Sequence, residues 1–257
     1  MKTVQLYNGD VTLEFNDVKH VYTWKEIGKP VRGATSVLKW LNKPALIQWA
    51  ANMACQEMER ELIDYFNVCQ GIPTDGEVRD LCGKAKTAHR RKASEAADIG
   101  TEVHKFAELT LAGQSPDMPE DQNARKGCGA FLEWLDAHKI EPIHLEHMLF
   151  SKKHYFAGTC DFYGRIDGKL CALDFKTSSG IYPEMIIQVN GAYALALEEM
   201  YGERIEESWI VRLDKKTGKF EAKRIPRSDE DQTAFRVLLE VDYHMKRLDE
   251  KVKELRK

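Results

Sequence analysis

The sequence predicts an α/β protein whose core is a mixed central sheet flanked by helices, with an N-terminal hairpin and a helical extension. Three short strand-like runs, 144–151, 157–166 and 169–177, follow one another in the middle of the chain. Helical patterns lie on either side of them, at about 77–111 and from 229 onward. Strands bracketed by helices are typical of a sheet whose faces are covered by helices.

The composition is that of an ordinary globular protein. Of 257 residues, 43% are hydrophobic and 31% are charged, and the net charge is −3, which argues against a protein that coats nucleic acid. Any contact with DNA must therefore come from a local basic patch. No run of about 18 apolar residues is present to span a membrane, and the N-terminus lacks the apolar core of a secretion signal. The six cysteines never form C-x-x-C, so we expect a reducing cytoplasm, that of a bacterium or a phage-infected host.

The N-terminus predicts a hairpin. Runs 4–7 and 11–15 are strand-like and flank Asn8-Gly9, the dipeptide that best suits a type I′ turn. A segment rich in glycine and proline follows at 28–33, and we expect it to be a loop.

The next segments are helical. Thr35 or Ser36 is placed to cap a helix that breaks near Pro44 and then resumes. Two further helical patterns cover about 77–111 and 122–138.

The second half of the chain supplies the sheet. The strand-like runs 157–166 and 169–177 are joined at Asp167-Gly168, which is a hairpin signal. The later elements are a helix at about 183–200, strands at 207–213 and 219–225 with a turn at 216–218, and a long charged helix from about 229. We divide the chain into 1–95, a hairpin and helical region within the same globule, 96–225, the core, and 226–257, the terminal helix.

Two carboxylates and a lysine are concentrated at the end of this predicted sheet. Asp174 and Lys176 are two apart on one strand, so they project from the same face while Phe175 points into the other layer. Pairing through the Asp167-Gly168 turn brings Asp161 to the face of Asp174. Converging buried carboxylates repel each other unless a cation lies between them, and oxygen ligands suit Mg²⁺ or Mn²⁺.

The individual motifs have ordinary interpretations as well. D-x-K is common and often marks an exposed, salt-bridged turn, and a lone histidine such as His104 is commonly a surface or core residue. Gly100 stands one turn before His104 in a helical pattern, where glycine costs about 1 kcal/mol relative to alanine. The combination therefore favours a site more than any single motif does.

Together the motifs resemble the RecB-like branch of the PD-(D/E)XK nucleases, in which G-x-x-x-H, G-x-x-D, D-x-K-T and Q-x-x-x-Y occur in this order. The resemblance covers residues 95–200, and 34–50 is similar to the start of phage and mitochondrial single-strand exonucleases of this group. Glu146 stands where many members carry a supporting glutamate. The matching residues are Gly100, His104, Gly158, Asp161, Asp174, Lys176, Thr177, Gln188 and Tyr193.

The resemblance implies metal-dependent hydrolysis of phosphodiester bonds in DNA by one or two Mg²⁺ or Mn²⁺ ions. The implied metal ligands are His104, Asp161, Asp174 and the backbone carbonyl of Phe175. The implied catalytic residues are Asp161, Asp174, Lys176 and Gln188. Lys176 would orient or help deprotonate the attacking water, and Gln188 would position the nucleic acid or Lys176.

One spacing departs from the family pattern. Tyr193 is five residues after Gln188 instead of four, which on a regular α-helix rotates the two side chains apart by about 140°. A local bulge would restore the pair. Some relatives hold an iron–sulfur cluster through cysteines after this helix, but no cysteine follows Cys171, so we expect no such cluster.

A basic run precedes the His104 helix and is a candidate contact for the phosphate backbone, with a solvated helix face as the alternative. The predicted nucleic-acid-binding residues are Lys84, Lys86, Arg90, Arg91 and Lys92, with Thr177 and Tyr193.

Two further sequence patterns each allow two interpretations. His144 and His147 hint at zinc, but strand residues three apart point to opposite faces, which argues against it. The terminal helix carries apolar residues three and four apart from 238 to 255, a short heptad seam. We expect it to pack back on the body, with self-association as the alternative.

The leading functional hypothesis is an exonuclease acting on DNA ends, with preference for single strands, in recombination, replication or repair. The alternatives are a flap- or structure-specific endonuclease of the same fold and a nuclease-derived module that binds DNA or a recombination partner without cutting. The intact set of Asp161, Asp174 and Lys176 argues against the last. Neither G-x-G-x-x-G nor a Walker motif is present, which disfavours nicotinamide and nucleoside-triphosphate enzymes.

Overall fold

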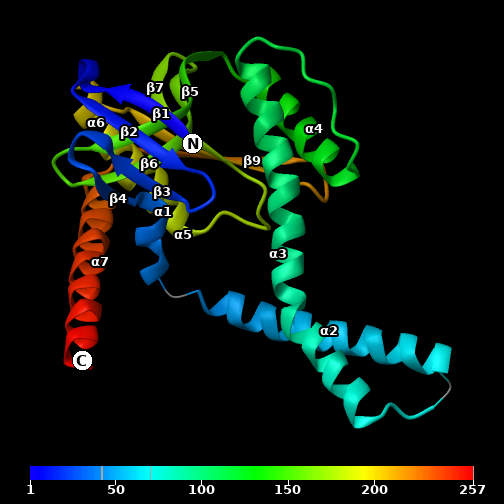
Figure 1. Ribbon diagram of the computed structural model, residues 1–257. Helices are drawn as coiled ribbons and strands as arrows, with labels where there is room; N and C mark the ends of the chain where they lie inside the picture. The colour runs from blue at the N-terminus through cyan, green and yellow to red at the C-terminus, as the bar shows by residue number, and fades with distance from the viewer. Residues whose placement is uncertain (42, 70, 257) are drawn as a thin grey trace. The chain divides into compact units, whose positions relative to one another are not determined.

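The computed structural model describes residues 1–41, 43–69 and 71–256. Contacts divide the chain into two compact units, Met1–Leu41 with Glu102–Lys257, and Asn42–Thr101. The first unit contains the sheet and the second contains two helices (Figure 1). The predicted division at residue 95 differs from this one because the N-terminal strands are hydrogen-bonded into the main sheet and the second unit is an insertion between them and the remaining strands.

The first unit is built on a mixed sheet. Its described strands are β1 (Lys2–Leu6), β2 (Val11–Asn16), β3 (Val21–Trp24), β4 (Lys29–Gly33), β5 (Ile140–Ser151), β6 (Phe156–Ile166), β7 (Lys169–Lys176), β8 (Glu207–Leu213) and β9 (Phe220–Pro226). Their order is β1-β2-β3-β4-β6-β7-β8-β9, with β5 paired to β6. The β4–β6 and β7–β8 pairs are parallel and the other pairs are antiparallel. The predicted α/β class with a mixed sheet is confirmed.

Helices cover both faces of this sheet (Figure 1). The described α-helices are α1 (Ala34–Val37), α2 (Pro44–Cys69), α3 (Asp75–Leu111), α4 (Gln122–Asp136), α5 (Pro183–Ile186), α6 (Ala194–Tyr201) and α7 (Asp229–Leu255). Short 3₁₀ turns lie at η1 (Tyr7–Gly9), η2 (Lys25–Ile27) and η3 (Leu38–Trp40), and η4 (Ile187–Tyr193) is a π-helix. No described helix combines the length and apolar character needed to cross a bilayer.

Each face of the sheet has its own apolar core. On one face, Phe131 and Trp134 of α4 pack on Phe175 of β7, with ring centroids 5.5 Å apart in both cases. On the other face, α1, η4, α6 and α7 share a buried cluster that includes Val189 and Phe235. Buried aromatic side chains each remove a large apolar area from water, so the sheet is fixed between two dry layers.

The N-terminal hairpin is confirmed, but its predicted two-residue turn is wrong. Leu6 pairs with Val11, so four residues form the loop. Asn8 does adopt the left-handed conformation expected of it, with φ of 57°. Tyr7 shares this conformation, and its hydroxyl donates to the Phe150 carbonyl, 2.7 Å away.

The segment 28–33, predicted as a loop, is largely strand β4. Pro30 lies opposite Thr23 of β3, whereas the pairing of β4 with β6 begins only at Arg32. The missing N–H of proline is therefore tolerated, because this part of β4 has one neighbour. The strand β3 was not predicted.

The helix after β4 begins earlier than predicted. Its N-cap residue is Gly33, and no side chain caps it. Thr35 and Ser36 lie within the first turn, so the prediction that either of them is the cap is wrong. Ala34 is buried in the core cluster, which places the start of the helix through packing instead of capping.

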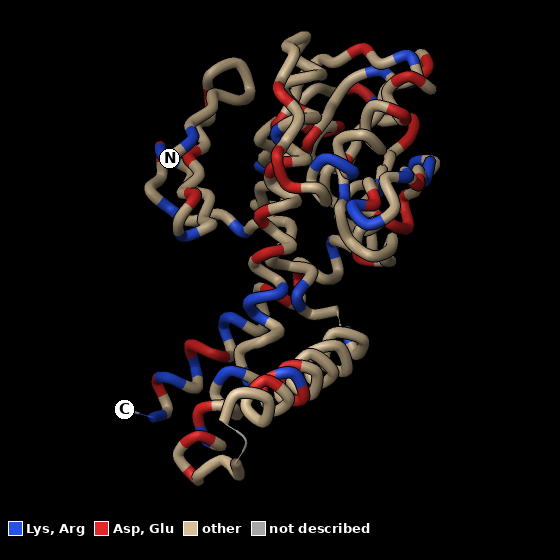
Figure 2. The backbone as a smooth tube through the Cα atoms, turned by 90° about the vertical axis from the view of Figure 1, so that its right-hand side faces the viewer, with Lys and Arg blue, Asp and Glu red and all other residues tan. Residues whose placement is uncertain are grey.

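Helix α7 packs back on the body through only its first half. Phe235, Leu239 and Asp242 are buried. Leu248 and Leu255, which belong to the predicted heptad seam, are 53% and 77% exposed. Along the second half of α7, lysine and arginine residues alternate with acidic residues (Figure 2). The expectation that this helix packs back on the body is therefore confirmed for its first half and wrong for its second half.

Candidate functional site

Three side chains from separate elements of the first unit converge beside the sheet. His104 comes from α3, Glu146 from β5 and Asp161 from β6, and one potential ligand atom of each lies within 4.8 Å of the others. His104 Nδ1 is 3.3 Å from Asp161 Oδ2. Among the described residues, this is the group of histidine and carboxylate side chains that is close enough to hold a metal ion.

A second group is centred on Asp174 at the end of β7. Asp174 is buried, with 3% of its surface exposed. Its carboxylate forms an ion pair with Lys176 and accepts a hydrogen bond of 3.2 Å from Gln188 Nε2. Strand alternation accordingly places Asp174 and Lys176 on one face, as the sequence predicts.

Phe175 joins the two groups. Its backbone N–H donates to Asp161 Oδ2 across 2.7 Å. Its ring points to the opposite face, where it packs on α4 and lies 6.3 Å from the His104 ring. The Asp161 carboxylate is thus oriented from two sides, by His104 and by the backbone of β7.

The electrostatics of the site reflect crowded carboxylates. Burial raises the pKa of Asp174 to about 6, in spite of the opposing attraction of Lys176. Burial, reinforced by the nearby Asp161, raises the pKa of Glu146 to about 7. Burial would lower the pKa of His104, but the charge of Asp161 raises it to about 9. Without further positive charge, the site therefore disfavours the ionised forms of Glu146 and Asp174 relative to isolated carboxyl groups.

The regular alternation of β5 is interrupted at Glu146, which has φ of 46°. As a result, His144 and His147 lie on one face with their rings stacked 4.3 Å apart, and the prediction that they point to opposite faces is wrong. His147 Nε2 is 2.7 Å from the hydroxyl of Tyr201. The same interruption accompanies the placement of Glu146 beside His104 and Asp161, a position that sequence reasoning gave only a supporting role.

The π-helix η4 restores the Gln188 and Tyr193 pair. Gln188 Nε2 donates to the Tyr193 hydroxyl, 2.6 Å away, and the same amide reaches Asp174. The five-residue spacing would separate the pair on an α-helix, but the wider π-turn brings the two side chains together.

Gly158 makes room for this pair. A Cβ atom at Gly158 would lie 3.0 Å from Cε1 of Tyr193 and 3.6 Å from Cβ of Ala34. The glycine of the G-x-x-D motif thus allows the tyrosine ring to pass over β6.

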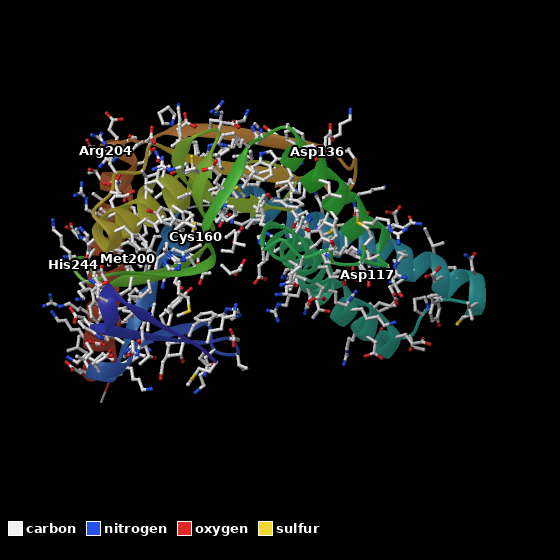
Figure 3. All side chains as sticks on the ribbon, turned by 90° about the horizontal axis from the view of Figure 1, so that it is seen from above. Asp117, Asp136, Cys160, Met200, Arg204 and His244 are labelled. Atoms are coloured by element: carbon white, nitrogen blue, oxygen red, sulfur yellow. The ribbon has the colours of Figure 1, made fainter. Side chains whose placement is uncertain are left out.

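Cys160 lies in the interior of β6, next to Asp161 (Figure 3). Its thiol donates to the carbonyl oxygens of Phe162 and Leu173, and burial raises its pKa well above the ordinary value. A buried, protonated thiol is not a nucleophile, so Cys160 is a packing residue.

The five basic residues predicted to hold a phosphate backbone all lie in the second unit, on α3. Three of them are paired with carboxylates: Lys84 with Glu61, Arg91 with Glu57 and Lys92 with Glu95. The remaining two, Lys86 and Arg90, have no ion-pair partner among the described residues. The predicted patch is thus partly neutralised within its own unit.

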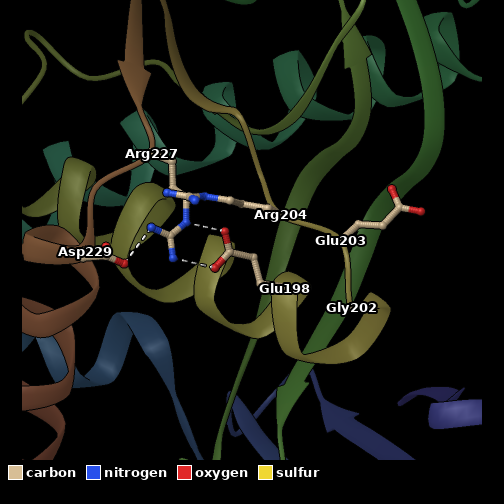
Figure 4. Close-up of a pocket in the computed structure, with 6 residues that line it drawn as sticks. All are labelled: Glu198, Gly202, Glu203, Arg204, Arg227 and Asp229. Carbon is tan, nitrogen blue, oxygen red and sulfur yellow. Dashed lines mark hydrogen bonds and ion pairs between the residues drawn. The ribbon is translucent and has the colours of Figure 1, made fainter.

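A surface pocket of about 350 Å³ lies apart from these groups (Figure 4). Its lining residues are Glu198, Gly202, Glu203, Arg204, Arg227 and Asp229. Arg227 donates to both oxygens of Glu198, at 2.6 and 3.1 Å. None of the predicted site residues lines it, and Arg227 also forms an ion pair with Asp229.

Comparisons with known proteins give only distant structural matches. No protein-family model matches the chain, and no curated protein matches it. An alkaline exonuclease from Laribacter hongkongensis aligns over 62% of this chain and 93% of its own, at 16% identity and a TM-score of 0.30. The same enzyme in complex with dAMP aligns over 63% and 93%, at 16% identity and a TM-score of 0.34. A protein designated SSO0001 aligns over 77% and 86%, at 16% identity and a TM-score of 0.35. Likeness at this level assigns neither family nor activity, so the function is argued from the site itself.

Proposed function

We propose that the protein is a divalent-metal-dependent DNA nuclease of the RecB-like PD-(D/E)XK type, acting on DNA ends. The observation that carries this proposal is the convergence of His104, Glu146 and Asp161 beside the Asp174 and Lys176 ion pair. The order and identity of His104, Asp161, Asp174 and Lys176 match the motifs of that family, which supports the proposal.

The donor set fits a divalent cation that accepts oxygen and nitrogen ligands. Two carboxylates and one imidazole suit Mn²⁺, and carboxylates alone suit Mg²⁺. The raised pKa values of Glu146 and Asp174 support this fit, because positive charge in the site would offset the burial and the carboxylate repulsion that raise them. His104, Glu146 and Asp161 would hold the ion, and we propose Asp174 and the Phe175 carbonyl as further ligands.

A bound divalent ion supplies Lewis acidity and lowers the pKa of water. The protein's own groups have separate tasks. Lys176, 22% exposed and paired with Asp174, presents its ammonium group where it can orient an attacking water and offset charge on a phosphate oxygen. Gln188 fixes the Asp174 carboxylate, and Phe175 N–H fixes Asp161. The site is therefore ordered before a substrate arrives.

Strandedness and cleavage mode can be tested with labelled DNA. Linear and covalently closed circular substrates, single- and double-stranded, would be incubated with Mg²⁺, Mn²⁺ or EDTA. We expect metal-dependent loss of linear single strands and intact circles, with Lys176→Ala inactive and the surface variant Lys139→Ala unaffected. Cleavage of circles would instead establish an endonuclease. Binding without cleavage of any substrate would establish a DNA-binding module and overturn the proposal.

A further inference from the structure

The loop that follows Lys176 carries an exposed aromatic ring. Residues 177–182 join the end of β7 to α5, and the sequence Thr-Ser-Ser-Gly-Ile-Tyr contains no charged side chain. Tyr182 is 40% exposed although it is a large aromatic side chain. An exposed ring of this kind offers a flat apolar face to a ligand.

The residues that flank this loop and the short helix after it contact the same carboxylate, that of Asp174. Lys176, immediately before the loop, forms an ion pair with Asp174. Gln188, at the start of η4 and one short helix after the loop, donates to the other oxygen of Asp174. Tyr182 lies midway between these two attachment points, six residues from each. Six residues of chain span at most about 20 Å, so connectivity keeps Tyr182 within a few nucleotides of the reacting group.

The ring is ordered within the loop. Its hydroxyl is 2.8 Å from Oγ of Ser179, and Ser178 Oγ donates to the Gly180 carbonyl across 2.8 Å. A Cβ atom at Gly180 would lie 3.6 Å from Cζ of Tyr182, so the edge of the ring rests against this glycine. Ile181 anchors the loop by packing against the buried cluster. An aromatic ring held in this way loses little conformational entropy when it stacks.

We propose that Tyr182 stacks on a nucleobase next to the scissile phosphate and that it selects unpaired DNA ends. This inference rests on the proposed nuclease function. Stacking on an aromatic ring tolerates every base, because each has a flat π-face, and it requires a base that is free of its own strand neighbours. The loop carries no charged side chain that would attract phosphates from a distance, so the contribution of the ring is to position the strand.

The experiment compares three variants on single-stranded oligonucleotides. For Tyr182→Ala, we expect the KM to rise about 5- to 100-fold, the range that corresponds to loss of one stacked base, with kcat changed less. Tyr182→Phe keeps the ring and should stay within about twofold of the wild-type KM, whereas Tyr182→Leu, which keeps volume without a π-face, should resemble alanine. An abasic nucleotide at the stacked position should abolish the difference between wild type and Tyr182→Ala.

A second readout does not depend on cleavage. An oligonucleotide with 2-aminopurine near its end would be bound in EDTA, where stacking on the ring quenches its fluorescence. Quenching by wild type and Tyr182→Phe but not by Tyr182→Ala supports the inference. Equal quenching by Tyr182→Ala, or none by wild type, overturns it. If quenching depends on Tyr182 while no DNA is cleaved with any metal, the nuclease proposal fails and the stacking site stands.

Discussion

Gln188 donates a hydrogen bond of 2.6 Å to the hydroxyl of Tyr193 across a π-helical turn, and the same amide reaches Asp174 at 3.2 Å. The π-helix is a local distortion that costs backbone regularity, and such turns are frequent at functional sites. Here it accommodates one extra residue without separating the pair. The tyrosine thereby orients the amide that orients the carboxylate.

The first prediction concerns this chain of contacts. Tyr193→Phe removes the hydroxyl and leaves the Gln188 amide less fixed, so we expect nuclease kcat to fall about 5- to 30-fold, as for loss of one buried hydrogen bond worth about 1–2 kcal/mol. Steady-state kinetics on linear single-stranded DNA would measure it.

The matched control for that prediction is Tyr201→Phe, which removes the hydroxyl bonded to His147 outside this chain of contacts. Its kcat should stay within about twofold of wild type. An equal fall in both variants would show a general effect of losing a tyrosine hydroxyl and would contradict the positioning role of Tyr193.

The second prediction concerns the metal ligands. Glu146→Gln removes one charged donor from the group with His104 and Asp161, so we expect Mn²⁺ affinity to fall at least about 10-fold. Isothermal titration calorimetry of the protein with Mn²⁺ measures this without DNA. Glu141→Gln, exposed on the same strand, should bind Mn²⁺ as the wild type does. Unchanged affinity in Glu146→Gln would remove that residue from the proposed site.

The third prediction concerns Gly158. Ala at this position would place Cβ 3.0 Å from the Tyr193 ring and close to Ala34, so a shift of the ring is required. We expect Gly158→Ala to destabilise the fold by about 1–3 kcal/mol and to lower kcat. Gly129→Ala in α4, where Cβ meets nothing within 4 Å, should be neutral or stabilising by about 0.5–1 kcal/mol. Denaturant unfolding of both variants provides the comparison.

The fourth prediction concerns a buried ion pair far along the chain. Asp242 of α7 is buried and accepts hydrogen bonds from Arg32 of β4 and from the indole of Trp40. Asp242→Asn leaves Arg32 without its counter-charge, so we expect a loss of about 3–5 kcal/mol in the free energy of unfolding. Asp249→Asn, exposed on the same helix, should change it by less than about 0.5 kcal/mol.

The ion pair between Asp242 and Arg32 also makes the free energy of unfolding depend on pH. Burial would raise the pKa of Asp242, but the hydrogen bonds from Arg32 and Trp40 hold it below the ordinary value of 3.8. The stabilisation is therefore present above that value and lost as pH falls through the lower folded pKa. Urea unfolding would be measured between pH 6 and pH 3. The difference in the free energy of unfolding between wild type and Asp242→Asn should become smaller only below about pH 4. A difference that shrinks already between pH 6 and 5 would contradict this assignment.

Much of the sheet and the site follows from short-range pattern. Asp167-Gly168 predicts the β6–β7 hairpin, and alternation predicts that Asp174 and Lys176 share a face. These inferences succeed because strand periodicity and turn chemistry are local. The order of motifs along the chain then indicates which residues meet, and His104 and Asp161 do meet.

The missed features depend on tertiary contacts. The positive φ of Glu146 reverses the expected facing of His144 and His147, and no sequence signal marks it. The π-helix at η4 could be anticipated from the extra residue before Tyr193, but only packing decides whether the helix bulges. The strand β4 was mistaken for a loop because glycine and proline tolerate an edge position as well as a turn.

The most direct test of the central claim is the initial rate of nucleotide release from end-labelled linear single-stranded DNA, with Mn²⁺ and with EDTA, for wild type and Asp161→Asn. The site described above predicts release by the wild type only with the metal, and a rate at least about 100-fold lower for Asp161→Asn, whose fold is checked by its unfolding curve. Release in EDTA, or equal rates for the two proteins, would contradict it.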